Sequence, residues 1–201
     1  TVTVPASQAS VTFFYSLPLL VMILYLVGFM GCGKSSIGRR LAERTGFAFA
    51  DTDRMVEETA GRTIPEIFAT DGEAAFRAME SAALRSISDE GNTIVATGGG
   101  TPCNPENLAW MKAHGHSVYI SITADYLYRI LYTRRQRRPK LAGLNDEELL
   151  RYIRTTLAER EPYYTQASAT IECTGASDRY IIDHILFYLD HLTAADRPTS
   201  R

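Results

Sequence analysis

The sequence lacks the cysteine patterns that stabilise secreted domains or hold zinc. It has three cysteines in 201 residues, Cys32, Cys103 and Cys173. They are far apart, and none belongs to a Cys-x-x-Cys pair or a Cys/His ligand spacing. These positions therefore favour neither a disulfide framework nor a zinc site. We expect three free thiols and a reducing, cytoplasmic location.

An excess of charge of either sign is also missing. The 21 Lys and Arg residues nearly balance the 23 Asp and Glu residues, which leaves a formal net charge of −2. Such a balance gives no global electrostatic reason to expect nucleic acid or an anionic membrane as a partner. We expect neither, so any basic patch must be local.

One long apolar run is present, from Val11 to Met30, and it is about as long as a membrane-spanning helix requires. Pro18 interrupts the run, and its second half leads directly into a glycine-rich loop. That half, which begins at Met22, is more typical of a buried parallel strand. We therefore expect residues 1–21 to be an extension outside the fold. A membrane anchor in this extension is the alternative.

After Met22, short apolar runs alternate with helical patterns, which predicts an α/β fold with a parallel sheet and helices on both faces. With 45% apolar residues the chain can bury one core, so we expect a single domain. The expected strands lie at about 22–28, 47–50, 93–97, 117–122 and 169–173. The expected helices lie near 34–45, 63–70, 73–89, 105–113, 125–135, 146–160 and 178–192. The domain is expected to span 22–193, followed by a flexible tail at 194–201.

The segment Gly28-Phe-Met-Gly-Cys-Gly33-Lys34-Ser35 matches the P-loop pattern between a predicted strand and a predicted helix. In this pattern backbone N–H groups turn toward the phosphates, Lys34 reaches the β and γ phosphates, and the Ser35 hydroxyl is placed for Mg²⁺. A glycine turn with an incidental lysine is the alternative, but a chance match has a probability on the order of one in a hundred. The expected ATP-binding residues are Gly31, Cys32, Gly33, Lys34, Ser35 and Ser36, with the Cys32 side chain serving packing.

The guanine-reading segment of regulatory GTPases is absent, because none of the three lysines stands in an Asn-Lys-x-Asp sequence. No Asp-x-x-Gly switch sequence occurs either. A kinase instead needs acidic groups at the carboxyl ends of strands and cations around the transferred phosphoryl group. Both are present, so a kinase is favoured.

Asp51 and Asp53 end the second predicted strand, at the sheet edge where open α/β proteins bind ligands. Residues two apart in an extended segment share a face, so both carboxylates are expected to point into one crevice. One could serve the metal shell while the other accepts the proton of the substrate hydroxyl. The alternative is a cap for the next helix plus a solvated acid.

Arg77 and Glu80 are three residues apart and share a helical face. As an exposed pair they would contribute only about 0.3–0.5 kcal/mol, whereas a carboxylate that orients an arginine can make it an anion site. The strand near 93–97 ends in three glycines, Gly98 to Gly100. Such a run indicates close approach of the backbone to something bound.

A cluster of basic residues lies at 134–140, which could be a solvated face or a nucleic-acid patch. It has no interleaved aromatic residues, and a lid that closes over ATP explains it better. We expect a mobile lid over about 132–145, in which Arg134 and Arg138 bind ATP. Pro139 should hold Arg138 in an extended conformation.

Together these motifs resemble the shikimate kinase family from about Met22 to Leu192. The resemblance rests on the P-loop in its Gly-x-Met-Gly-x-Gly-Lys-Ser form, Asp51 with Asp53, Phe76-Arg77 with Glu80, Thr97 to Gly100, Arg138-Pro139, and Glu159-Arg160-x-Pro162-x-Tyr164. One departure is Lys140, which stands where leucine is common in the family.

The resemblance implies a three-layer P-loop kinase fold of the nucleoside-monophosphate-kinase type, with a five-stranded parallel sheet and a mobile lid. It implies ATP-dependent phosphorylation of the 3-hydroxyl of shikimate. Asp53 would contact the reacting hydroxyl, and Asp51 would reach Mg²⁺ through water. The implied shikimate site comprises Asp53, Arg77, Gly98, Gly99, Gly100, Arg138 and Arg160, with Arg77 and Arg160 on the carboxylate. The expected catalytic residues are Asp53, Lys34 and Arg138.

Two alternatives of function remain open. One is a catalytically silent relative that binds nucleotide or shikimate, which the retention of Lys34, Asp53, Arg77 and Arg138 argues against. The other is a gluconate-type sugar-acid kinase, which would not require the Gly98–Gly100 and Arg160 pattern. We expect a monomer whose ligands are ATP and shikimate.

Overall fold

The computed structural model describes residues 22–88, 90–138 and 140–192. The predictions for residues 1–21 and 194–201 lie outside these ranges. The strands are β1 (Ile23–Val27), β2 (Ala48–Asp51), β3 (Thr93–Ala96), β4 (His116–Ser121) and β5 (Ala169–Glu172). The helices are α1 (Lys34–Thr45), α2 (Thr52–Ala60), α3 (Ile64–Thr70), α4 (Gly72–Arg85), α5 (Pro105–His114), α6 (Ala124–Tyr132), α7 (Asp146–Tyr164) and α8 (Asp178–Asp190), with short 3₁₀ helices η1 (Thr101–Cys103) and η2 (Arg135–Arg137).

The five strands form one parallel sheet in the order β2-β3-β1-β4-β5. All five residues of β1 are buried, as expected for a central parallel strand with helices on both faces. This burial confirms that the apolar run after Met22 is a strand. Because the strands are parallel, their carboxyl ends gather at one edge of the sheet.

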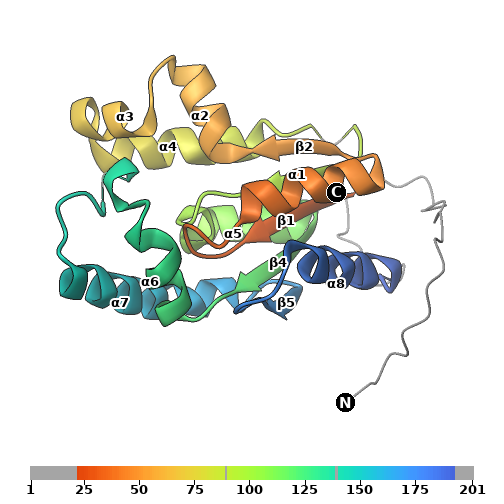
Figure 1. Ribbon diagram of the computed structural model, residues 1–201. Helices are drawn as coiled ribbons and strands as arrows, with labels where there is room; N and C mark the ends of the chain where they lie inside the picture. Colours follow the sequence, from red (N-terminus) through yellow and green to blue (C-terminus); the bar gives the residue numbers. More distant parts are fainter. Residues whose placement is uncertain (1–21, 89, 139, 193–201) are drawn as a thin grey trace.

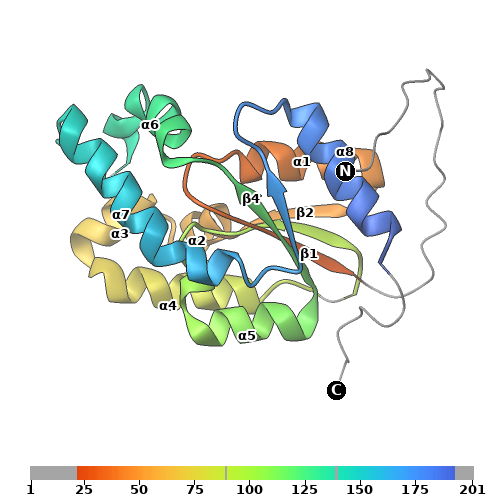
Figure 2. The same cartoon turned by 90° about the horizontal axis from the view of Figure 1, so that it is seen from below.

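Helices cover both faces of this sheet, which confirms the three-layer prediction. Helices α1 and α8 contact each other on one face, and α5 covers the other face beside α4 (Figures 1 and 2). Helices α2, α3, α6 and α7 gather around the end of the sheet that carries the loop between β1 and α1 (Figure 1).

All five predicted strands and all seven predicted helices occur, but one helix was not predicted. Helix α2 begins directly after β2, and Asp51 caps it by accepting hydrogen bonds from the N–H groups of Asp53 and Arg54. Helix α4 ends at Arg85, four residues earlier than expected. Helix α7 runs through Pro162 to Tyr164, although a proline removes one helical hydrogen bond.

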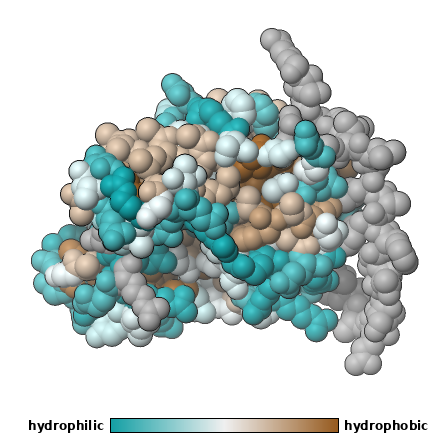
Figure 3. Space-filling view, turned by 90° about the horizontal axis from the view of Figure 1, so that it is seen from above, coloured by the Kyte–Doolittle hydropathy of each residue, from teal (hydrophilic) through white to brown (hydrophobic). Residues whose placement is uncertain are grey.

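Two apolar clusters stabilise the chain. The main core surrounds the sheet, while a smaller cluster of Val56, Ile67, Phe76 and Ala83 joins α2, α3 and α4. On the face shown in Figure 3, apolar areas alternate with hydrophilic ones, which is normal because more than half of a folded surface is apolar. No helix among the described residues is long and apolar enough to cross a bilayer.

Candidate active site

The loop between β1 and α1 has the backbone conformation that its glycines allow. Gly28, Gly31 and Gly33 have φ angles of 144°, 87° and 94°, which residues with side chains rarely adopt. Gly33 directly precedes α1, whose first N–H groups have no acceptor within the helix. The start of this helix therefore offers N–H donors for an anion.

Lys34 is the first residue of α1, and its side chain turns back to this loop, with 8% of the residue's surface exposed. Its Nζ donates hydrogen bonds to the carbonyl oxygens of Gly28 (2.8 Å) and Phe29 (3.0 Å) and lies 3.5 Å from Sγ of Cys32. The ammonium group thus sits where the loop would enclose phosphates. Ser35 and Ser36 are exposed in the first turn of α1.

Asp51 and Asp53 are not placed as the sequence predicted, because no extended segment joins them. Asp51 ends β2 and its Oδ1 caps α2, while Asp53 lies in the first turn of α2. The capping alternative was right for Asp51. Asp53 still faces the site, since its Oδ1 lies 2.7 Å from the Cβ position of Gly98 and Asp53 lines the cavity described below.

The carboxyl group of Asp53 is perturbed by its surroundings. Burial, followed by repulsion from Glu80 and Asp51, raises its pKa from the ordinary value to about 6, against the attraction of Lys34 and Arg138. A carboxylate with a raised pKa near a P-loop is suited to accept a proton at neutral pH.

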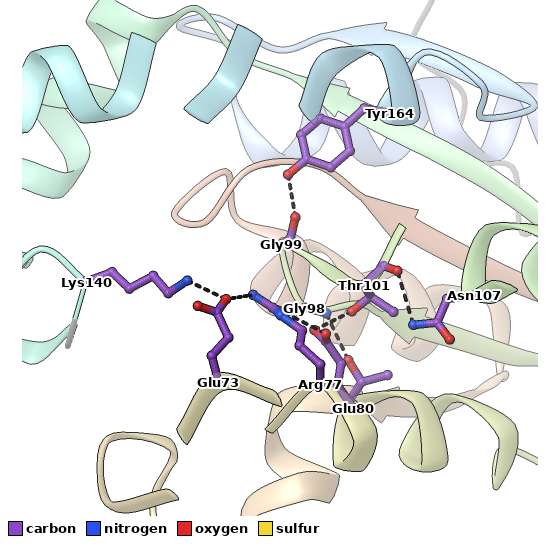
Figure 4. Close-up of polar contacts among 10 residues, drawn as sticks. Glu73, Arg77, Glu80, Gly98, Gly99, Thr101, Asn107, Lys140 and Tyr164 are labelled. Atoms are coloured by element: carbon purple, nitrogen blue, oxygen red, sulfur yellow. Dashed lines mark hydrogen bonds and ion pairs between the residues drawn. The ribbon is translucent and has the colours of Figure 1, made fainter. Parts of the chain in front are cut away.

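Arg77 is held by two carboxylates on α4. Its Nη1 donates to Oε2 of Glu80 at 2.7 Å, and its Nη2 donates to Oε1 of Glu73 at 3.1 Å. Glu80 is 1% exposed, and its Oε1 accepts a hydrogen bond from the Thr101 hydroxyl at 2.6 Å (Figure 4). The prediction that a carboxylate orients Arg77 is therefore confirmed, and the pair is not an exposed surface pair.

Side chains and backbone lie close to the three glycines after β3, so that a Cβ at any of them would crowd its neighbours. A Cβ at Gly98 would lie 2.2 Å from Glu80 Oε1, and one at Gly100 would lie 2.5 Å from Arg77 Nη1. A Cβ at Gly99 would lie 3.2 Å from the amide nitrogen of Met30 in the P-loop. None of these three glycines has the left-handed conformation, so close approach is the reason for glycine at each position.

Arg160 reaches the same place from α7. Its Nη1 lies 3.5 Å from the Cβ position of Gly99, and its guanidinium carbon is 5.8 Å from the centre of the Phe29 ring. One turn further along α7, the Tyr164 hydroxyl donates to the Gly99 carbonyl oxygen (Figure 4). Helix α7 is thereby tied to the glycine turn.

Arg138 lies between η2 and α7 with φ −125° and ψ 115°, which confirms the extended conformation predicted from the following proline. Burial lowers its pKa, whereas the nearby Asp53 carboxylate raises it. Arg134 is exposed, and it does not line the cavity described next.

These side chains meet at a cavity of about 220 Å³. It is lined by Met30, Asp53, Glu57, Ile64, Pro65, Phe68, Phe76, Arg77, Glu80, Gly99, Gly100, Arg138, Lys140 and Arg160. Of the predicted acceptor residues only Gly98 is not in this lining, and it packs beneath Asp53 and Glu80. The cavity therefore combines a candidate base, three arginines and the edge of the P-loop.

Comparison with known proteins identifies the family of the chain. The model of the shikimate kinase family matches residues 30–190. The chain belongs to the shikimate kinase family. It is 35% identical to a shikimate kinase of Bacteroides thetaiotaomicron over 84% of this chain and 97% of the relative, and 41% identical to one of a Synechococcus species over 89% and 86%.

Solved structures of this family have the same fold. A shikimate kinase from Acinetobacter baumannii in complex with shikimate is 35% identical and superposes with a TM-score of 0.77, covering 86% of this chain and 96% of that one. The Aquifex aeolicus shikimate kinase is 32% identical, with a TM-score of 0.73 over 84% and 96%. As a shikimate kinase, the chain is an ATP-using transferase of the shikimate pathway.

Some residues that line the cavity were not predicted from the sequence. The wall formed by Ile64, Pro65 and Phe68 belongs to α3, and Glu57 belongs to the helix that was missed. Their apolar spacing indicates only an amphipathic helix, which gives no sign of a ligand. Lys140 also lines the cavity, whereas the sequence marks it only as a departure from the family pattern.

Proposed function

We propose that this chain transfers the γ-phosphoryl group of ATP to the 3-hydroxyl of shikimate in the cavity beside the P-loop. The observation that carries this proposal is that the Cβ position of Gly99 lies 3.2 Å from the amide nitrogen of Met30 in the P-loop and 3.5 Å from Nη1 of Arg160. The phosphate loop and the anion-binding arginines therefore share one wall. An acceptor held by its carboxylate there can present a hydroxyl to a bound nucleotide.

Asp53 is the proposed base. As the hydroxyl oxygen attacks the γ phosphorus, a new P–O bond forms, the bond to the β-phosphate oxygen breaks, and ADP leaves. The hydroxyl proton passes to Asp53, whose pKa of about 6 leaves it ionised at neutral pH. A carboxylate with the ordinary pKa would be a weaker base.

Cations around the transferred group supply the other part of the chemistry. We assign Lys34 to the β and γ phosphates and Arg138 to the charge that develops on the moving phosphoryl oxygens. The backbone of Gly31 to Ser36 would hold the phosphates, and Arg134 stays a candidate ATP contact. Arg77 and Arg160 would bind the acceptor carboxylate with paired guanidinium donors.

We further propose Mg²⁺ as the cofactor, held by the Ser35 hydroxyl and, through water, by Asp51. No cluster of three acidic, His or Cys side chains among the described residues could hold a metal alone. The exposed Ser35 hydroxyl lies in the first turn of α1 beside the P-loop, and the half-buried Asp51 carboxylate ends β2 at the same edge of the sheet. Both are hard oxygen donors, which fits a metal that arrives with the nucleotide. When bound, Mg²⁺ would neutralise charge on the phosphates.

We also propose that the chain is a monomer in a reducing cytoplasm. Neither nucleic acid nor a membrane is a proposed partner. Cys32, Cys103 and Cys173 are free thiols, which supports a reducing compartment. Sedimentation of the full chain should give the mass of one chain.

An ADP-release assay with three acceptor conditions tests the proposed reaction. ATP and Mg²⁺ are supplied with shikimate, with gluconate or with no acceptor. We expect ADP release with shikimate alone. Equal release with gluconate would support the sugar-acid kinase alternative, and no release above background with shikimate would support a silent relative.

A further inference from the structure

Lys140 connects the segment between η2 and α7 to the wall of the cavity. Its Nζ lies 2.6 Å from Oε1 of Glu73 on α4 and 5.5 Å from the centre of the Phe68 ring on α3. The next residue, Leu141, is fully buried in the main core. Lys140 is therefore held in place by its neighbours, unlike a lysine that extends freely into solvent.

The same oxygen of Glu73 also accepts the hydrogen bond from Arg77, so a chain of alternating charges runs along the cavity wall. It consists of Lys140, Glu73, Arg77 and Glu80, joined by distances of 2.6, 3.1 and 2.7 Å (Figure 4). In the picture Glu73 lies directly between the lysine and the arginine. Without Lys140, Arg77 would face two carboxylates and the group would carry a net negative charge.

This charge balance matters because Arg77 is the proposed acceptor-binding group. A carboxylate that approaches Arg77 is repelled by Glu73 and Glu80, and repulsion between like charges at short range is weakened when a cation pairs with one of them. Hydrogen bonding to Lys140 also holds the pKa of Glu73 below its ordinary value, so this carboxylate stays charged at neutral pH. Glu80 is buried and paired with Thr101, which leaves Glu73 as the group that Lys140 can offset.

We propose that Lys140 is a positioning residue for the anionic acceptor: by pairing with Glu73 it offsets one of the two carboxylates beside Arg77 and keeps that arginine available to a carboxylate ligand. This role rests on the proposed binding of shikimate at Arg77. Lys140 acts through Glu73 and does not take part in the transfer of the phosphoryl group.

A double-mutant cycle on Lys140→Met and Glu73→Gln tests this role. Lys140→Met should raise both the KM and the calorimetric Kd for shikimate about 3- to 10-fold, as expected for a partly exposed ion pair beside a bound charge. The kcat and the KM for ATP should change less than about twofold, and Lys140→Arg should restore the affinity. In the Glu73→Gln background, Lys140→Met should change the affinity less than about twofold, because the carboxylate to be offset is gone.

Lys112→Met is the matched control, because Lys112 pairs with Gln166 at 2.9 Å and does not line the cavity. It should leave every constant unchanged. If Lys140→Met weakens shikimate binding equally with and without Glu73→Gln, Lys140 acts independently of Glu73 and the proposal is wrong. A fall in kcat or in ATP affinity with unchanged shikimate affinity would also overturn it. Turnover of shikimate by the wild-type chain tests the proposed function. If the wild type turns over shikimate, the results with the variants test only the role of Lys140.

Discussion

Asp53 lies in the first turn of α2 and lines the cavity. The sequence places it near the site by its position after a strand, and the structure places it there as part of a helix that β2 enters at once. Its neighbours, Glu80 and the backbone of Gly98, are distant in sequence. Its raised pKa therefore depends on tertiary contacts that no local pattern contains.

Asp53→Asn should stabilise the fold at neutral pH. The pKa of Asp53 is raised to about 6, so the folded state holds the proton more tightly than the unfolded state. The resulting stability is fully present below about pH 4 and is lost as the pH rises through 6. We expect Asp53→Asn to increase the free energy of unfolding by roughly 1–3 kcal/mol at pH 7.5 and by much less at pH 4.5.

Urea denaturation at both pH values measures this effect. Asp125→Asn is the control, because Asp125 forms an exposed pair with Arg154 and should change the stability by less than about 1 kcal/mol. If Asp53→Asn and Asp125→Asn behave alike at pH 7.5, the Asp53 carboxyl is not destabilised by its surroundings.

At the scale of elements, the glycine turn after β3 brings the P-loop, α2, α4 and α7 together. Gly100→Ala should displace Arg77, because the new Cβ would lie 2.5 Å from Nη1 of a guanidinium that a buried carboxylate holds. We expect shikimate binding to weaken by about tenfold, corresponding to the loss of one good hydrogen bond to a charged group. ATP binding should change little.

Calorimetric titration with each ligand checks this prediction. Gly91→Ala serves as the control, since a Cβ there meets no described atom within 4 Å. Unchanged shikimate affinity in Gly100→Ala would mean that the position of Arg77 does not matter for the acceptor.

Arg138 lies in the segment between α6 and α7, and its proposed role is to stabilise charge on the transferred phosphoryl group. Its planar fork can stabilise charge on several phosphoryl oxygens, which the point charge of lysine does not reproduce. We expect Arg138→Lys to lower kcat by at least about 10²-fold, a cautious value for an arginine in this role. The Kd for ATP should stay within a few-fold.

Arg135→Lys is the matched control from the same segment. Arg135 pairs with Asp146 at 2.6 Å and lies over the Tyr132 ring, so it points toward α7 and α6. Steady-state kinetics should show a mild effect for this control. Equal, small losses in both variants would show that the cluster acts as diffuse positive charge.

The element pattern itself was largely predictable from the sequence, because hydrophobic periodicity and capping residues reflect local physics. Thr63 with Glu66 forms a capping box at the start of α3, and Asn104 caps α5 before Pro105. Helix α2 was missed because Asp51-Thr52-Asp53 can end a strand or begin a helix, and tertiary packing decides between them. The pairing of Lys140 with Glu73 was also hidden, since 67 residues separate the two.

At the scale of the whole molecule, the sheet order puts the P-loop strand at the centre, with the Asp51 end of β2 two strands away. Predicting the strands along the chain does not give their order within the sheet. The start of β1 is anchored by its own contacts, since the amide N–H of Met22 donates to Asn92 Oδ1 at 2.8 Å and its carbonyl accepts from Thr93.

Deleting residues 1–21 should therefore leave an active enzyme. We expect the truncated chain to express in soluble form, with kcat and both KM values within about twofold of the full chain and a similar Tm. Insolubility of the truncated chain, or extraction of the full chain only with detergent, would favour the membrane-anchor alternative.

We propose that one cavity holds the acceptor by its carboxylate and takes a proton from its hydroxyl at Asp53. Shikimate binding measured by calorimetry and turnover measured by ADP release, both in Asp53→Asn and Arg160→Ala, test this arrangement. Asp53→Asn should bind shikimate within a few-fold of the wild type but lose at least about 10²-fold in kcat, as for the loss of a general base. Arg160→Ala should weaken shikimate binding roughly 10- to 150-fold, the cost of a charge-assisted contact to a carboxylate, with ATP affinity unchanged. Near-normal turnover in Asp53→Asn would show that Asp53 is not the base, and loss of ATP binding in place of shikimate binding in Arg160→Ala would show that Arg160 serves the nucleotide.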